Sequence, residues 1–250
     1  MDLGIKGKRA LVTAASKGLG RGCAMALAEA GVDLVINARG EAALEATAEE
    51  LRRFGVRVIT LAADITTEAG QVAVLTAAHG TDILITNAGG PPPGSWEDWT
   101  RADYLRAIDA NMLTPIALMT HLLPGMIAKG WGRVINITSQ SVRAPIPQLG
   151  LSNMARTGLT GFVGGTARQV APFGVTINNL LPGIHDTDRA RVLDAGNPDA
   201  RTAREATIPA RRYGTPAEFG QMCAFLCSVH AGFIVGQNIL LDGGATNITM

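Results

Sequence analysis

Three polar residues near the middle of the chain have types and spacings that suit chemistry on an oxygen-containing substrate. Ser139 ends the apolar stretch GRVINITS, and Ser152 and Arg156 lie four residues apart in LSNMARTGL. A serine hydroxyl donates a hydrogen bond, but it is far too weakly acidic to act as a general acid near neutral pH. Arginine keeps its charge and a planar fork of donors, so Arg156 suits a ribose hydroxyl, a carboxylate, a phosphate or an ordered water.

A histidine and two tyrosines are the other candidates for moving a proton. His185 follows Pro182 and Gly183, and imidazole titrates near neutral pH, although an ordinary loop histidine is the alternative. Tyr104 and Tyr213 are the only tyrosines of the chain. We expect Tyr104 at a helix surface or interface and Tyr213 in a structural role.

The stretch TAASKGLG, residues 13–20, follows one apolar run and opens a helical one. In this setting, backbone N–H groups at the helix N-terminus face a pyrophosphate, and Gly18 and Gly20 permit close backbone approach. Ala14 stands where the first glycine of a G-x-x-x-G-x-G loop would be, which adds strain if the position requires a positive φ. Taken alone, these glycines fit the packing of a helix on a strand equally well.

Two basic residues favour a dinucleotide with an additional phosphate. Lys17 lies inside the loop, and Arg39 follows the second apolar run, which ends INAR without an acid. An acid at this point binds the ribose hydroxyls of NAD, whereas an arginine accommodates the 2′-phosphate of NADP. The pattern predicts NADP(H) over NAD(H), with solvated surface charges as the alternative reading.

The elements that must position these residues alternate between strand and helix. Apolar, strand-forming runs are followed by helical stretches, which predicts a parallel sheet covered by helices on both faces. We therefore expect a single α/β domain over residues 1–250, with a Rossmann-like, doubly wound parallel sheet. The polar, arginine-rich segment at about residues 185–215 interrupts the alternation and is expected to form a substrate lid. The expected strands, about seven, lie at residues 9–14, 32–39, 56–64, 82–90, 132–139, 174–183 and 236–244.

Composition excludes several classes of protein. Hydrophobic residues make up 47% of the chain and the formal net charge is +1, so nothing indicates a nucleic-acid or membrane partner. No apolar run of membrane length and no signal peptide are evident. Three cysteines suit a reducing cytoplasm, and Cys223 and Cys227 are expected in the core, because no histidine completes a metal site.

These motifs together resemble the short-chain dehydrogenase/reductase family, in particular the bacterial branch that includes 3-oxoacyl-carrier-protein reductases. The markers occur in order along nearly the whole chain: TAASKGLG, AADIT, TNAGG, DANMLTP, GRVINITSQS, NNLLPGIHDT and GQNILLDGG. The resemblance implies that Ser139 donates to the substrate oxygen and that Asn111 holds a water or bends its helix. It also implies a cofactor site formed by Thr13, Ala15, Ser16, Lys17, Gly18, Leu19, Gly20, Arg39, Asp64, Ile65, Asn87, Ala88, Gly89, Pro182, Gly183 and Thr187.

The chain departs from that family at its catalytic pair. Ser152 and Arg156 occupy the positions of the family's tyrosine and lysine, and the downstream TGLTGF keeps the register. We expect an NADP(H)-dependent oxidoreductase acting on a small carbonyl or alcohol through an atypical site formed by Ser139, Asn111, Ser152, Arg156 and His185. The alternatives are an NADP(H)-binding protein without efficient turnover, or non-redox chemistry like that of halohydrin dehalogenases. The resemblance also implies a cytoplasmic homotetramer.

Overall fold

A parallel sheet forms the centre of the protein. In the computed structural model, which describes residues 1–195, 197 and 199–248, seven strands pair in the order β3-β2-β1-β4-β5-β6-β7. Every pairing is parallel, and the order reverses between β1 and β4. Such a reversal opens a crevice at the carboxyl ends of the strands, where doubly wound folds bind their ligands.

The strands are shorter than their apolar runs, because the last polar residues of each run leave the sheet and enter the loops above it. Their bounds are β1 Arg9–Val12, β2 Asp33–Ala38, β3 Val58–Ala62, β4 Ile83–Thr86, β5 Gly132–Ile137, β6 Val175–Pro182 and β7 Asn238–Leu241. The helices are α1 Gly18–Glu29, α2 Glu41–Arg52, α3 Glu68–Ala77, α4 Arg101–Ile108, α5 Thr114–Ala128, α6 Gly150–Val170, α7 Asp188–Asp194, α8 Ala200–Thr207 and α9 Pro216–Cys227.

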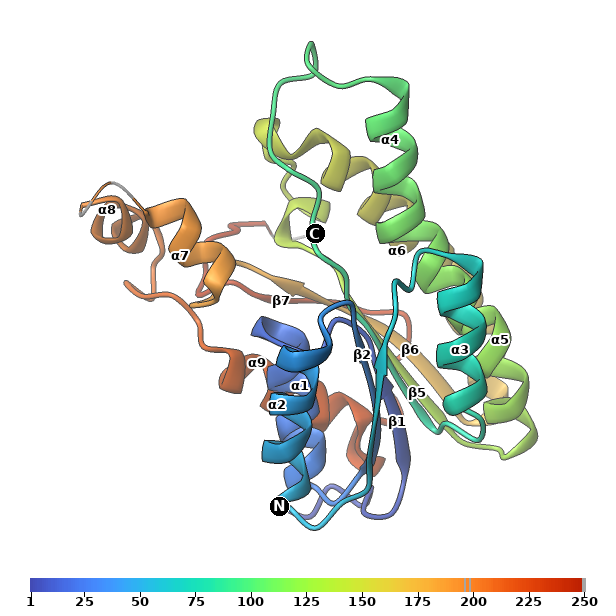
Figure 1. Ribbon diagram of the computed structural model, residues 1–250. Helices are drawn as coiled ribbons and strands as arrows, with labels where there is room; N and C mark the ends of the chain where they lie inside the picture. Colours follow the sequence, from blue (N-terminus) through green and yellow to red (C-terminus); the bar gives the residue numbers. More distant parts are fainter. Residues whose placement is uncertain (196, 198, 249–250) are drawn as a thin grey trace.

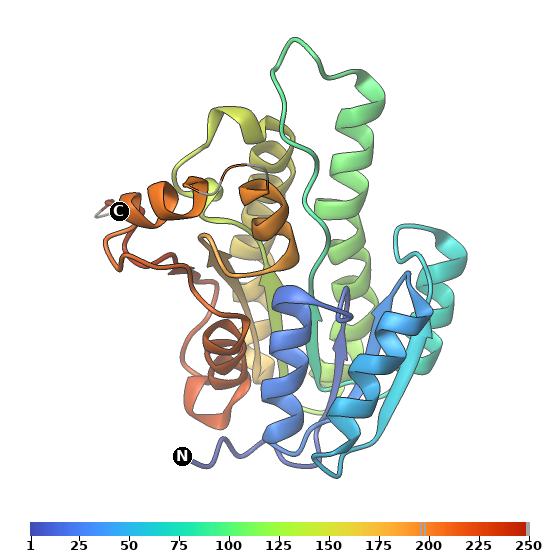
Figure 2. The same ribbon diagram turned by 60° about the vertical axis from the view of Figure 1, so that its left-hand side comes forward.

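Helices cover both faces of this sheet (Figure 1). One hydrophobic cluster joins α1, α2 and α9 to one face, and a second joins α3, α5 and α6 to the other. Turning the molecule shows α7 and α8 standing apart from both layers, above the carboxyl ends of the strands (Figure 2). The predicted fold class is therefore confirmed, and the arginine-rich segment contains two short helices.

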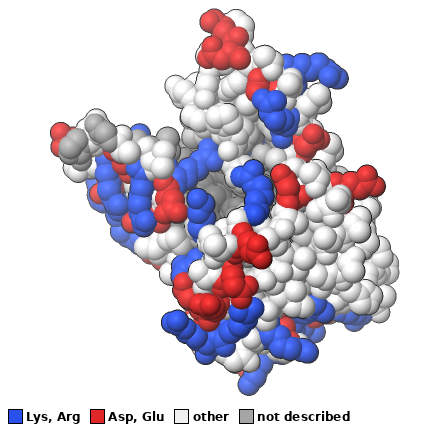
Figure 3. Space-filling model, in the orientation of Figure 1, with Lys and Arg blue, Asp and Glu red and all other residues white. Residues whose placement is uncertain are grey.

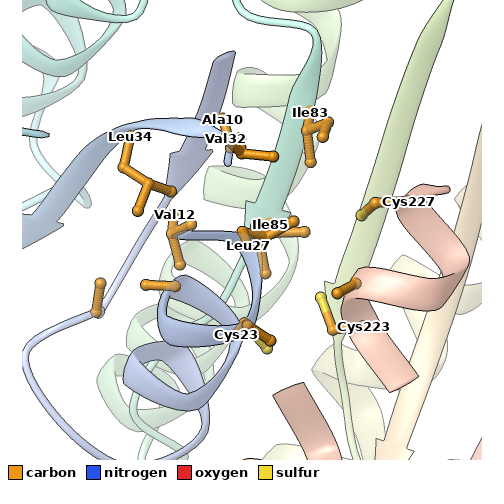
Figure 4. Packing of buried hydrophobic residues seen from close by; sticks show 14 of the residues in the cluster. Ala10, Val12, Cys23, Leu27, Val32, Leu34, Ile83, Ile85, Cys223 and Cys227 are labelled. Atoms are coloured by element: carbon orange, nitrogen blue, oxygen red, sulfur yellow. The ribbon is translucent and has the colours of Figure 1, made fainter. Parts of the chain in front are cut away.

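Small residues let α1 and α9 approach closely. A Cβ at Gly220 would lie 2.1 Å from the backbone oxygen of Gly22, so this crossing has no room for a side chain. The three cysteines are buried at the same contact, with Cys23 on α1 and both Cys223 and Cys227 on α9 (Figure 4). Burial raises the pKa of Cys227, which fits their expected role as core residues.

The sequence shows no apolar run of membrane length, but the structure contains one helix long enough to be compared with a membrane span. A π-helical turn, Asp109–Leu113, joins α4 to α5, and the continuous helix Arg101–Ala128 is 28 residues long. By length and composition alone it would pass as a membrane span, with a mean hydropathy of 1.2 in its most apolar window. Within the fold, 44% of that window is buried.

Candidate functional site

A cleft of about 1180 Å³ opens at the carboxyl end of the sheet. It begins at the glycine loop between β1 and α1, passes the ends of β2 and β4, and reaches Ser139 after β5 and Arg156 on α6. Basic side chains border the hollow on the visible face of the molecule (Figure 3). The cleft thus joins the predicted cofactor loop to the predicted reactive residues.

The glycine loop has the backbone strain that its sequence predicts. Ala14 adopts a φ of +47° and Gly18 a φ of +58°. Only glycine adopts such angles without cost, so Ala14 is strained. A Cβ at Gly20 would lie 2.4 Å from the Ala14 oxygen and 2.8 Å from Nδ2 of Asn87, so that position requires glycine.

Hydrogen bonds connect this loop to β4 across the crevice. The Thr13 hydroxyl donates to the backbone oxygen of Asn87 at 2.7 Å and accepts from its backbone N–H at 2.8 Å. The Asn87 side chain donates to the Ala14 oxygen at 3.4 Å. Thr13 therefore holds the loop from beneath, and it does not line the cleft itself.

The end of the cleft beyond the loop is charged. Arg39 is exposed there, and Asp64 after β3 lies near it. Hydrogen bonds from Thr66, together with the nearby Arg39 charge, lower the pKa of Asp64. Lys17 lies 3.9 Å from Asp188 at the start of α7, in an exposed ion pair.

At the other end, Ser152 and Arg156 contact each other. Arg156 Nη1 donates to Ser152 Oγ at 2.6 Å, and both side chains are buried, with Arg156 only 8% exposed. Burial, and secondly the charge of Arg189, lowers the pKa of Arg156 to about 10. Ser139 Oγ accepts from the backbone N–H of Ser141 at 3.1 Å, which leaves its own proton free to donate into the cleft.

Asn111 lies below the cleft. It sits in the π-helical turn, where Nδ2 donates to the Ala107 oxygen at 3.3 Å and Oδ1 has no partner among the described residues. Asn111 and Arg156 line a second cavity of about 10 Å³, close to the size of one water. Arg156 borders both spaces, as do Asn87, Ala88 and Ile137.

His185 lines the cleft from a packed position. Its ring lies edge-on to Phe219 at 5.2 Å, and Nδ1 lies 3.2 Å from the Gly183 oxygen. Burial lowers the pKa of His185, so the imidazole is neutral at pH 7. Because a carbonyl oxygen only accepts, Nδ1 carries the proton and Nε2 has none to donate.

The two tyrosines pack against other parts of the protein. Tyr213 is buried, and its hydroxyl donates to Asp194 Oδ1 at 3.2 Å, as expected of a structural residue. Tyr104 is half-buried and lies edge-on to Trp99 at 6.4 Å. Within the described part of the chain, neither one lines the cleft.

Most of the predicted site residues meet at this cleft, whereas Thr13, Ala15, Gly20 and Asn111 support it from beneath. Sequence reasoning missed Arg189, which donates to the backbone oxygens of Gly90 at 3.0 Å and Pro91 at 3.1 Å. Its only signal was its place in the arginine-rich segment. The residues lining the cleft as predicted are Ser16, Lys17, Gly18, Leu19, Arg39, Asp64, Ile65, Asn87, Ala88, Gly89, Ser139, Ser152, Arg156, Pro182, Gly183, His185 and Thr187.

Comparisons with known proteins identify the family of the chain. The family model described as Enoyl-(Acyl carrier protein) reductase matches residues 13–246. The 3-oxoacyl-(acyl-carrier-protein) reductase FabG of Vibrio cholerae is 34% identical over 248 residues, covering 97% of this chain and 98% of that protein. L-sorbose reductase from Gluconobacter frateurii, solved with NADPH and L-sorbose, has a TM-score of 0.92 at 29% identity, covering 99% of this chain and 100% of that one. The chain belongs to the short-chain dehydrogenase/reductase family of oxidoreductases.

Proposed function

We propose that this protein is an NADP(H)-dependent oxidoreductase that acts on a small carbonyl or alcohol through an atypical active site. The observation that carries the proposal is the continuous cleft from the Gly18 loop to Ser139 and Arg156. A relative solved with NADPH and a sugar, L-sorbose, supports a nicotinamide cofactor and a small substrate.

The preference for NADP(H) rests on charge at the end of β2. Ala38 ends the strand, Arg39 follows it, and Lys17 lies across the cleft. Fluorescence titration should give tighter binding of NADPH than of NADH. Arg39→Ala should weaken NADPH selectively, since it removes a charge-assisted contact to the phosphate. Arg53→Ala, an exposed change at the far end of α2, is the matched control and should leave both affinities unchanged.

The residues of the chain can bind and polarise a carbonyl oxygen, while bound NADPH would supply the hydride. Ser139 donates to that oxygen, and the charge of Arg156 stabilises the forming alkoxide. Loss of a general acid typically costs about 10²–10⁴ in rate. Neutral His185 has no proton on Nε2, so water in the cleft is the preferred proton source.

A restoration experiment tests this mechanism. Ser152→Tyr combined with Arg156→Lys should raise carbonyl reduction by at least about tenfold if the missing acid limits the rate. Ser139→Ala should abolish the native turnover. A double variant that folds and binds NADPH but gains no activity would contradict the proposal.

A second candidate function is NADP(H) binding without efficient turnover. It is favoured by the direct contact between Ser152 and Arg156, which occupies the two side chains with each other. NADPH binding without reduction of any member of a broad carbonyl panel would favour this candidate.

A further inference from the structure

We propose that the substrate carries a carboxylate and that Arg156 binds it; the site takes a small oxo acid, with the carbonyl beside Ser139. This inference rests on the proposed function and specifies its substrate class. Reduction would pass a hydride from NADPH and a proton from water to the carbonyl, giving a hydroxy acid, NADP⁺ and a hydroxide ion that leaves to solvent. The carboxylate itself stays unchanged.

The first argument is the unmatched charge of Arg156. Arg156 is buried, with only 8% of the residue exposed, and its guanidinium donates a hydrogen bond to Ser152, a neutral group. No carboxylate forms an ion pair with it within the described residues, and the charge acting on it is that of another cation, Arg189. Burying a charge without a counter-charge is energetically unfavourable, so binding of an anionic ligand beside Arg156 would reduce this desolvation penalty.

The second argument is the set of free donors. A guanidinium has five N–H donors and accepts nothing, so the bond to Ser152 leaves donors available to a ligand. Arg156 lines the cleft that also holds Ser139, so those donors lie beside the proposed carbonyl site. A planar fork matches a carboxylate in two parallel hydrogen bonds, which a ribose hydroxyl does not require.

The third argument is the distribution of charge along the cleft. Lys17 pairs with Asp188, and Arg106 pairs with Asp103. Arg189 instead donates to the backbone oxygens of Gly90 and Pro91, and no carboxylate among the described residues forms an ion pair with it. Asp109 also lines the cleft with the opposite charge, and both Asp109 and Arg189 are exposed to solvent. The buried charge of Arg156 is therefore the one at this end of the cleft that solvent screens least.

Calorimetry with small anions tests the proposal without turnover. Oxamate carries a carboxylate next to a carbonyl that resists reduction, and oxamide is its neutral counterpart. With NADP⁺ at saturation, which fills the phosphate sites, oxamate should bind at least about tenfold more tightly than oxamide. Inorganic phosphate, titrated in parallel, should bind more weakly than oxamate.

Variants of Arg156 then test whether oxamate binds at this residue. Arg156→Gln should weaken oxamate at least about tenfold while changing NADPH affinity less than about threefold. Arg156→Lys keeps the charge but loses the fork, so it should weaken oxamate to a smaller degree. Arg168→Gln, an exposed change on the same helix, is the matched control and should have no effect.

Several results would overturn the inference. These are equal binding of oxamide and oxamate, oxamate binding that survives Arg156→Gln, and tighter binding of phosphate than of oxamate. A variant that loses NADPH affinity and keeps oxamate would assign Arg156 to the cofactor instead. If Arg156→Gln does not fold, two other measurements test the inference. These are the difference in affinity between oxamate and oxamide in the native protein, and the affinity of Arg156→Lys for oxamate. If NADP⁺ does not bind, the proposed function fails, and the titrations of the nucleotide-free protein still test the anion site.

Discussion

Replacing Ala14 by glycine should make the protein more stable, although glycine usually destabilises a fold. Ala14 is held at a φ of +47°, in the left-handed region. For a residue with a Cβ, that conformation costs about 1–2 kcal/mol, and glycine does not have this cost. Against this gain, the greater freedom of glycine in the unfolded chain costs about 0.5–1 kcal/mol. The net expectation is a gain of about 0–1.5 kcal/mol for Ala14→Gly.

The neighbouring residue supplies the matched control. Ala15 is fully buried and is not among the residues with positive φ. Ala15→Gly carries the same entropic cost, and it also loses the burial of one methyl group, worth about 0.8 kcal/mol. Because the entropic cost is shared, the two variants, one residue apart, should differ by about 1.8–2.8 kcal/mol in the free energy of unfolding.

Thermal unfolding followed by circular dichroism measures this difference. At about 2–4 °C per kcal/mol for a domain of this size, the two melting temperatures should differ by at least about 3 °C, with Ala14→Gly the higher. Urea titration at 25 °C gives the same comparison in free energy. Equal destabilisation by both changes would refute the assignment of strain to Ala14. NADPH affinity should not fall in Ala14→Gly, because a smaller residue leaves more room beside the pyrophosphate.

Two further predictions come from the structure and a third, the oligomeric state, from the family resemblance. Gly20→Ala should destabilise the fold by about 1–3 kcal/mol and weaken NADPH, because its Cβ would collide with the Ala14 oxygen and Asn87; urea titration and fluorescence measure both. Burial lowers the folded-state pKa of His185 below 6.5. The unfolded chain therefore binds more protons than the folded protein as the pH falls below 6.5, and the free energy of unfolding decreases as the pH falls. His185→Gln should remove the part of this loss of stability that comes from His185, measured by urea titration between pH 7 and pH 5. Sedimentation velocity at micromolar concentration should show a homotetramer, and a stable monomer would contradict that expectation.

The sequence alone was sufficient for the fold and for most of the residues that line the cleft. Alternating apolar runs and helical stretches specify a parallel sheet, because each side of it must be buried by the helices that connect its strands. The loop residues could be placed since they follow strand ends, and parallel strands bring all their carboxyl ends to one edge. Even the strain at Ala14 was predictable, because the spacing of Gly18 and Gly20 identifies the position that requires glycine.

Contacts between distant segments were decided only by the tertiary structure. The burial of Arg156 and the bonds from Arg189 to Gly90 and Pro91 depend on which other elements the fold brings beside each side chain. The packing of His185 on Phe219, some thirty residues later in the chain, likewise has no local signal. Sequence spacing determines which residues share an element, whereas burial and the pKa of a side chain depend on what other elements bring beside it.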